Sequence, residues 1–244
     1  MKISEESVIG ELVAQDYRKA AVFQSNGIDF CCQGNRTIED ACNKKGLIPE
    51  NLIKELNAIG KQQTGNDINY QSWPIDLLAD YIEKTHHCYV TEKIPILKPY
   101  LEKICKVHGS QHPELLEIKD EFFAGADELT NHMRKEEMIL FPFIRSLANS
   151  KQKNQAIVSA QFGTVENPIH MMMEEHDVEG KRFRKIAALS NDYITPVDAC
   201  NTYKVTFAVL KEYEDDLHLH IHLENNILFP KAIVLEQELS LQIN

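Results

Sequence analysis

The stretch HMRKEEMILFP at residues 132–142 recurs in altered form as HIHLENNILFP at residues 220–230. Both copies read His-x-x-x-Glu, and Ile-Leu-Phe-Pro follows after two further residues. Residues four apart lie on one face of a helix, so each copy brings an imidazole beside a carboxylate. The two pairs are His132 with Glu136 and His220 with Glu224.

Each copy also has a histidine upstream at nearly the same distance. His87 lies 45 residues before His132, and His176 lies 44 residues before His220. This internal repeat predicts two helical hairpins, each of which offers one histidine and one His-x-x-x-Glu pair. His86 adjoins His87, but neighbouring helical residues point about 100° apart, and the helical phase favours His87.

Four long helical patterns surround these residues. The apolar positions recur every three or four residues, most clearly in the second pattern, and this period is typical of helices that bury one face. We expect helices over 75–107, with a break or kink at Pro95 and Pro99, and over 113–148, 166–189 and 197–236. Four such helices predict an all-α fold built on a four-helix bundle.

The six polar side chains fall on faces that have to be buried. Burying them without a cation costs several kcal/mol per unpaired charge, roughly, whereas a metal turns the same groups into ligands. Four imidazoles and two carboxylates are too many for one tetrahedral zinc and too rich in nitrogen for calcium or magnesium. We expect two iron ions bridged by both carboxylates and by an oxo or hydroxo group, with two histidines on each iron. The alternatives are exposed His–Glu pairs on the helix surface and, for His176, a buried histidine satisfied by a neighbour.

A small helical unit precedes the bundle. Ser4 is a candidate cap for a helix that ends near Gly27, Thr37 can begin a second helix, and a third can run from Pro49 to a point before Gly60. The polar stretch at 61–72 is typical of a linker. We therefore expect an N-terminal domain at 1–60, a linker at 61–72 and the bundle at 73–244.

Composition excludes several functions. A formal charge of -11 in 244 residues disfavours a nucleic-acid partner, which needs clustered Lys and Arg. No apolar run approaches the roughly 20 residues that span a bilayer, and the N-terminus is too polar for a signal peptide. We expect a cytoplasmic protein without a membrane partner, in which the six cysteines are mostly thiols.

The motifs resemble those of the RIC proteins (repair of iron centres), which are iron–sulfur cluster repair di-iron proteins related to hemerythrin. Nearly the whole chain takes part in the resemblance. Its marks, in the order and spacing of that family, are DFCCQG at 29–34, THHCYVTEKIP at 85–95, HMRKEEMILFP at 132–142, MEEHD at 173–177 and HIHLENNILFP at 220–230.

The resemblance implies a hemerythrin-like di-iron bundle and a separate N-terminal domain with vicinal cysteines. It implies repair of clusters damaged by nitric oxide or oxidants, with iron supplied by the centre and damaged iron–sulfur proteins as partners. The implied iron ligands are His87, His132, Glu136, His176, His220 and Glu224. Oxygen-carrying hemerythrins have a further histidine where this chain has Gly180, which disfavours reversible oxygen carriage.

Two other functions stay open, as do the enzymatic status and the choice between a monomer and a homodimer. One function is a sensor or scavenger that binds nitric oxide or oxygen, and the other is a di-iron nitric oxide reductase. Cys31 and Cys32 are candidate catalytic residues or two small residues at a turn. Glu128 and Glu175, near the ligands in sequence, are candidate hydrogen-bond acceptors behind the metal ligands, proton relays or surface charges. We expect the remaining histidines to be solvated: His108, His112, His170, His218 and His222.

Overall fold

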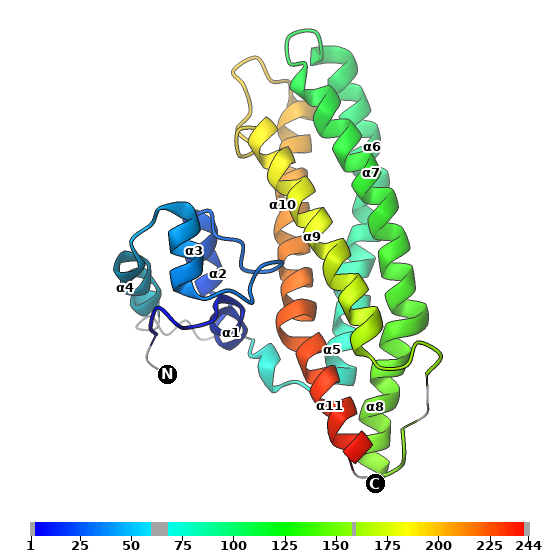
Figure 1. Ribbon diagram of the computed structural model, residues 1–244. Coiled ribbons are helices and arrows are strands. Elements are labelled where there is room, and N and C mark those ends of the chain that lie inside the picture. The colour runs from blue at the N-terminus through cyan, green and yellow to red at the C-terminus, as the bar shows by residue number, and fades with distance from the viewer. Residues whose placement is uncertain (1–2, 60–67, 158–159, 242–244) are drawn as a thin grey trace. The chain divides into compact units, whose positions relative to one another are not determined.

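The computed structural model describes residues 3–59, 68–157 and 160–241 (Figure 1). Over these residues the chain is helical, and β-structure is limited to two isolated bridges, Val8–Thr37 and Ala160–Gly163. The expected all-α class is confirmed. Contacts divide the chain into an N-terminal unit and a bundle unit. The N-terminal unit comprises Met1–Leu78, Leu147–Ile157 and Ile221–Asn244, and the bundle unit comprises Ala79–Ser146 and Val158–His220.

The N-terminal unit begins with four short helices. They are α1 (Ile9–Gln15), α2 (Lys19–Ser25), α3 (Ile38–Lys45) and α4 (Pro49–Ile59). Thr37 caps α3 as expected, since its hydroxyl accepts the Asp40 N–H at 3.1 Å. A 3₁₀ helix, η1 (Tyr70–Ser72), occupies the end of the predicted linker, and residues 61–67 of that linker lie outside the described residues. The boundary at 61–72 stays a prediction.

The predicted helix from Ser4 to Gly27 is wrong. Ser4 lies in a turn in which its N–H donates to the Ser7 hydroxyl at 3.0 Å, and α1 begins only at Ile9. The helical run is then interrupted at Asp16, whose backbone is extended. Its carboxylate accepts the Arg18 Nε–H at 2.8 Å, a local bond that competes with helix continuation.

The bundle unit contains the four long helices that the sequence predicts, and they run side by side in Figure 1. The three helical runs that contain α6, α7 and α10 each include a π-helical segment. In chain order the elements are α5 (Ile75–Tyr81), η2 (Ile82–His87), α6 (Cys88–His108), α7 (Glu114–Lys135), η3 (Glu136–Leu140), α8 (Phe141–Lys153), α9 (Glu166–Leu189) and α10 (Asn201–Leu223). The π helix η4 (Glu224–Leu228) and α11 (Phe229–Leu241) continue α10 along the chain and belong to the N-terminal unit by contacts. Helix α6 continues through Pro95 and Pro99, so the expected break there is wrong, and the alternative of a kink stays a prediction.

Aromatic rings fill the core of the bundle unit. Tyr213 is 1% exposed, and its ring contacts Phe122 edge-on at 5.4 Å and stacks on Phe183 at 5.6 Å between centroids. Rings of this kind bury large apolar areas, and each such pair contributes about 0.5–1.5 kcal/mol beyond that burial. The core therefore fixes the positions of α7, α9 and α10 relative to one another.

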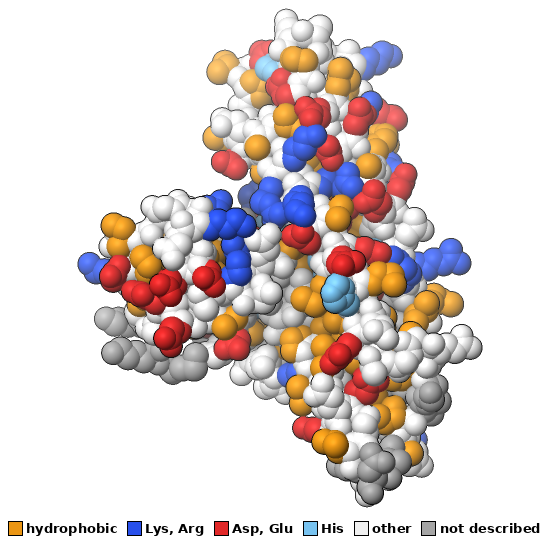
Figure 2. All heavy atoms as spheres, viewed as in Figure 1, with side chains coloured by type: hydrophobic (Ala, Val, Ile, Leu, Met, Phe, Trp, Pro, Cys, Tyr) orange, Lys and Arg blue, Asp and Glu red, His pale blue; other side chains and the backbone are white. Residues whose placement is uncertain are grey.

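The surface is mixed in charge. On the face drawn in Figure 2, Lys and Arg side chains are interspersed with Asp and Glu. Among the described helices, none combines the length and the apolar character that a membrane span requires.

Close contacts within the N-terminal unit join α1 to the loop before α3 and to η4. The Gly10 N–H donates to the Gly34 carbonyl at 2.7 Å, and a Cβ at Gly10 would clash with the Asn226 side chain of η4. Glycine at position 10 is therefore required by space, although it lies inside a helix, where alanine has the higher propensity.

We expect Gly10→Ala to destabilise the protein by about 1–3 kcal/mol, because the methyl group overlaps Asn226. In an Asn226→Ala background the same substitution should cost less, since the nearest obstructing atoms are gone and only the Gly34 carbonyl, 3.1 Å from the added Cβ, remains close. Urea denaturation of the four proteins of this double-mutant cycle gives both values. An equal loss in both backgrounds would show that Asn226 is not the obstacle.

Candidate metal centre

The structure buries all six predicted ligands. His87, His132, Glu136, His176, His220 and Glu224 are each 0–3% exposed. The alternative in which the His–Glu pairs lie on an exposed helix face is therefore wrong for these residues. Their burial needs a compensating interaction, because an isolated carboxylate at such a depth is strongly disfavoured.

The six side chains gather into two groups of four. One group is His87, Glu136, His220 and Glu224, and the other is His132, Glu136, His176 and Glu224. Within each group, one ligand atom from every residue lies within 4.8 Å of the others. Both carboxylates belong to both groups, whereas each imidazole belongs to one. This is the arrangement that two neighbouring cations sharing two carboxylates would need.

The separations between donor atoms fit metal coordination. His132 Nε2 lies 3.0 Å from His176 Nε2 and 3.3 Å from a Glu136 oxygen, and His87 Nε2 lies 3.4 Å from the same oxygen. Two nitrogens bound at about 2.1 Å to one ion, at a right angle, are about 3.0 Å apart. These separations are therefore close to those expected between ligands of one ion.

Each His-x-x-x-Glu copy changes from α to π helix at its glutamate. Glu136 begins η3, Glu224 begins η4, and the residue five places later donates its N–H to each glutamate carbonyl. Pro142 and Pro230 then follow; a proline has no N–H, and its ring crowds the carbonyl of the preceding turn, which favours a wider turn. The repeated Ile-Leu-Phe-Pro thus accounts for the local geometry, and π segments of this kind occur frequently at functional sites.

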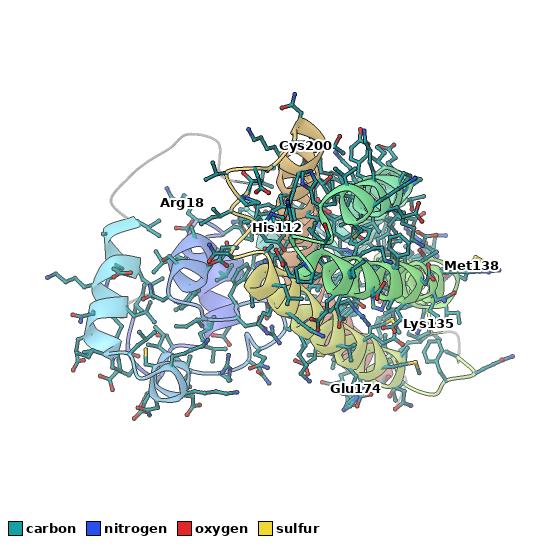
Figure 3. The ribbon with its side chains drawn as sticks, turned by 90° about the horizontal axis from the view of Figure 1, so that it is seen from above. Arg18, His112, Lys135, Met138, Glu174 and Cys200 are labelled. Carbon is teal, nitrogen blue, oxygen red and sulfur yellow. The ribbon has the colours of Figure 1, made fainter. Side chains whose placement is uncertain are left out.

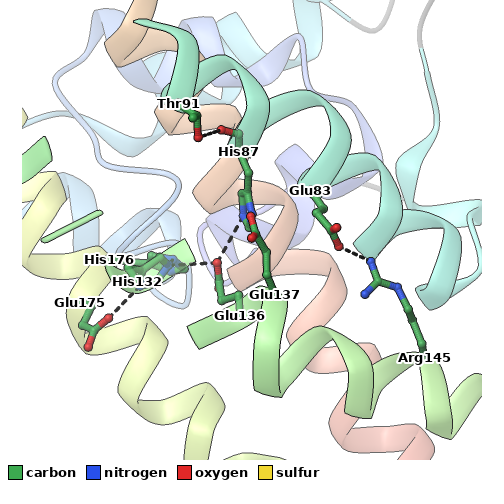
Figure 4. A network of polar contacts seen from close by, with 9 residues as sticks. All are labelled: Glu83, His87, Thr91, His132, Glu136, Glu137, Arg145, Glu175 and His176. Carbon is green, nitrogen blue, oxygen red and sulfur yellow. Dashed lines mark hydrogen bonds and ion pairs between the residues drawn. The ribbon is translucent and has the colours of Figure 1, made fainter. Parts of the chain in front are cut away.

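His87 also ends a π segment, η2, which the sequence did not predict. The Thr91 hydroxyl donates to the His87 carbonyl at 2.8 Å, so that the irregular turn keeps its backbone acceptor satisfied. Figure 4 shows this contact beside the ligand groups.

Two carboxylates hold the imidazoles in place. Glu137 contacts His87 Nδ1 at 2.8 Å, and Glu175 contacts His132 Nδ1 at 2.8 Å (Figure 4). These bonds put the proton on Nδ1 and leave the Nε2 lone pair for a metal. The His132 imidazole and the Lys135 ammonium lower the pKa of Glu175 to about 2, so this carboxylate is charged at neutral pH.

Of the two predicted relay candidates, Glu175 contacts the His132 imidazole, whereas Glu128 contacts Arg182. Glu128 is largely exposed, and its carboxylate pairs with Arg182 at 2.8 Å. The predicted relay roles of both residues remain predictions.

Three buried histidines were not predicted. His86 is 1% exposed, contacts Asp216 through Nδ1 at 2.9 Å and stacks on the His220 ring. The sequence signal for these contacts was the spacing of four residues between Asp216 and His220 on α10, which places both on one face of the helix. His108 and His222 are also buried, so the expectation that they are solvated is wrong.

His222 lies among aromatic side chains of the N-terminal unit. Its ring is 5.6 Å from that of Tyr17 and 6.0 Å from that of Phe30. Burial lowers the pKa of His222 to about 3, so it is neutral. The periodicity of α10 alone could not show this, because the covering rings come from residues far away in the sequence.

Comparison with known proteins agrees with this geometry. The family model of the hemerythrin HHE cation binding domain matches residues 79–232. The ScdA_N model, described as a domain of unknown function (DUF542), matches residues 5–60.

Curated relatives extend over almost the whole chain. The chain is 32% identical over 232 residues to the iron-sulfur cluster repair protein ScdA of Staphylococcus epidermidis, which covers 94% of this chain and 99% of the relative. It is 31% identical to ScdA of Staphylococcus haemolyticus, with the same coverage. It is 32% identical over 225 residues to the iron-sulfur cluster repair protein YtfE of Yersinia pestis, which covers 92% and 96%. The chain therefore belongs to the hemerythrin HHE family and, within it, to the family of the iron–sulfur cluster repair proteins ScdA and YtfE.

Proposed function

We propose that this protein repairs damaged iron–sulfur clusters in the cytoplasm, and that its bundle holds the iron for this work as a di-iron centre. The observation that carries the proposal is the sharing of Glu136 and Glu224 by two groups of imidazoles. The relatives that are named for cluster repair support it, because they match nearly the full length of this chain.

The two ligand groups divide the proposed ligands between the two ions. His87 and His220 would bind one iron, His132 and His176 would bind the other, and Glu136 and Glu224 would bridge the two. Imidazole and carboxylate together suit iron, whereas calcium and magnesium favour oxygen alone. Bound iron would supply metal for rebuilding a cluster and open coordination positions for small ligands such as nitric oxide or oxygen.

Neighbouring residues hold the proposed ligands in position for metal binding. Glu137 and Glu175 fix two imidazoles with Nε2 turned toward the ligand groups, and the burial of all six ligands limits access of water. The partners we propose are proteins with damaged iron–sulfur clusters, since iron from the centre would restore metal lost from a cluster.

The direct test follows labelled iron from this protein to a client. Protein loaded with ⁵⁷Fe should reactivate a nitric-oxide-damaged cluster enzyme and transfer the label into the rebuilt cluster, as measured by Mössbauer spectroscopy. Glu136→Ala should lose both irons and the repair activity, because Glu136 belongs to both ligand groups, whereas Glu174→Ala, at an exposed neighbouring position, should keep both. Reactivation without transfer of label would exclude iron supply, and full repair by iron-free Glu136→Ala would exclude the centre from the function.

The second expectation compares the contributions of the adjacent residues His86 and His87 to iron binding. His87→Asn should lose about one of the two irons, since only His87 belongs to a ligand group. His86→Asn should keep both, although it removes the ring stacked on His220. Metal analysis of the two purified variants makes the comparison, and equal loss from both would contradict the assignment of His87.

The third expectation concerns the carboxylate behind His132. Glu175→Gln keeps the size of the side chain and removes its charge, so iron should be bound about 10–100-fold more weakly. Glu174→Gln is the matched control, because Glu174 lies on the outer side of α9 with its side chain 70% exposed (Figure 3). Competition with a chelator measures both affinities, and similar values for the two variants would show that Glu175 does not support His132.

A further inference from the structure

The loop between α2 and α3 brings a second set of metal-binding side chains together. Asp29, Cys31 and Cys32 each offer one ligand atom, and these atoms lie within 4.8 Å of one another. Cys31 is buried, and the other two residues are half-buried. All three belong to DFCCQG at 29–34 in the N-terminal unit, and none is among the six ligands of the bundle.

Two of the three distances between donor atoms in this loop match the edges of a tetrahedral metal site, and the third is within 4.8 Å. The two Sγ atoms are 3.7 Å apart, and Cys31 Sγ is 3.5 Å from Asp29 Oδ1. With metal–sulfur bonds of about 2.3 Å and a metal–oxygen bond of about 2.0 Å, a tetrahedron has edges of about 3.8 Å and about 3.5 Å. A cation could therefore replace the thiol protons with little movement of the donor atoms.

Backbone hydrogen bonds hold the loop in this shape. Asp29 Oδ1 accepts the N–H groups of Cys31 at 3.1 Å, Cys32 at 2.9 Å and Gln33 at 3.4 Å. Gly34 completes the turn, where a Cβ would lie 2.5 Å from the Phe30 carbonyl. The donor groups are therefore positioned before any cation arrives, which reduces the entropy lost on binding.

Two asparagines of η4, which also belongs to the N-terminal unit, donate hydrogen bonds to the backbone of the loop. Asn225 Nδ2 donates to the Cys31 carbonyl at 3.2 Å, and Asn226 Nδ2 donates to the Phe30 carbonyl at 3.1 Å. These two bonds use backbone carbonyl groups and not the sulfur atoms. They anchor the backbone that carries the thiols, as supporting bonds do around established metal sites.

A cation bound in this loop would hold the sulfur atoms as thiolates. The hydrogen bond to Cys32 and burial raise the pKa of Cys31 well above its ordinary value. Cys31 thus lacks the lowered pKa of a nucleophilic cysteine, and a neighbouring positive charge would favour its thiolate form. Metal binding supplies that charge and releases the protons.

We propose that Asp29, Cys31 and Cys32 form a metal site that takes one thiophilic divalent cation, zinc or ferrous iron. Two thiolates and one carboxylate favour these ions over calcium and magnesium. Three protein ligands leave the fourth tetrahedral position for water or for a ligand from another molecule. The site rests on the geometry of the loop and does not depend on the proposed function of the bundle.

Cobalt(II) is the probe for this site, because thiolate ligands give it an intense near-ultraviolet charge-transfer absorption. The candidate ligands of the bundle are nitrogen and oxygen atoms, so they cannot produce this band. Full-length protein, reduced and free of oxygen, should develop the band as one equivalent of cobalt binds beyond those taken by the bundle. The absence of the band from folded protein would overturn the proposal.

Variants assign the band to the loop. Cys31→Ser and Cys32→Ser should each lose most of it, and Asp29→Asn should bind cobalt at least tenfold more weakly while retaining an oxygen that can accept the backbone N–H groups. Cys88→Ser removes an exposed cysteine outside the loop and should change nothing. A band that survives in a Cys31→Ser/Cys32→Ser double variant would contradict the assignment.

Circular dichroism and the iron content of the bundle are measured on the same samples, so that a folding defect or failure of the di-iron centre is recognised separately. If Cys31→Ser fails to fold, the Asp29→Asn affinity and cadmium binding to the unaltered protein decide the question. Zinc and ferrous iron are then added in competition. Displacement by one of them identifies the preferred cation, and failure of both to displace cobalt would contradict the proposed class of ligand.

Discussion

The burial of two carboxylates and four imidazoles at one level of a helical bundle is the constraint on which the rest of this structure depends. Each unpaired charge at that depth costs several kcal/mol, roughly, and a small bundle has little stability to spare. The paired ligand groups, the π segments that begin at Glu136 and Glu224, and the carboxylates of Glu137 and Glu175 all meet this constraint by aiming donor atoms at two common points. The apolar stripes around them would hold a bundle together without these groups.

The sequence predicted the bundle and the residues that converge in it because two regular signals coincide. The helical period placed the four long helices, with α9 at 166–189 as expected, and the His-x-x-x-Glu repeat fell in phase with the apolar stripes. A repeated spacing of four residues fixes a common face irrespective of tertiary contacts. For the same reason the Thr37 cap, which uses an oxygen three residues before Asp40, could be read directly from the sequence.

What the sequence did not predict depends on residues that are distant along the chain. The burial of His222 arises from Tyr17 and Phe30, and the burial of His86 arises from its contacts with Asp216 and His220. The early break at Asp16 results from a side-chain bond to Arg18 that competes with the helix at an otherwise regular position. Periodicity describes one helix at a time, so it cannot distinguish a covered face from a solvated one until the partner is known.

The two sets of donor atoms in this chain are suited to different tasks. The bundle donors favour retention of a metal, and the loop donors favour its exchange. In the bundle, each group of four nitrogen and oxygen donors is buried and supported by carboxylates, so that an ion held there would be shielded from solvent. In the loop, Cys31 is buried whereas Asp29 and Cys32 are half-buried, and three protein donors would leave one tetrahedral position to an outside ligand. Because a ligand can enter an open position before another leaves, the loop geometry favours fast exchange, whereas the bundle geometry favours slow loss. Asn225 follows the bundle ligand Glu224 directly and donates to Cys31, so one segment of backbone, η4, supports both sets of donors.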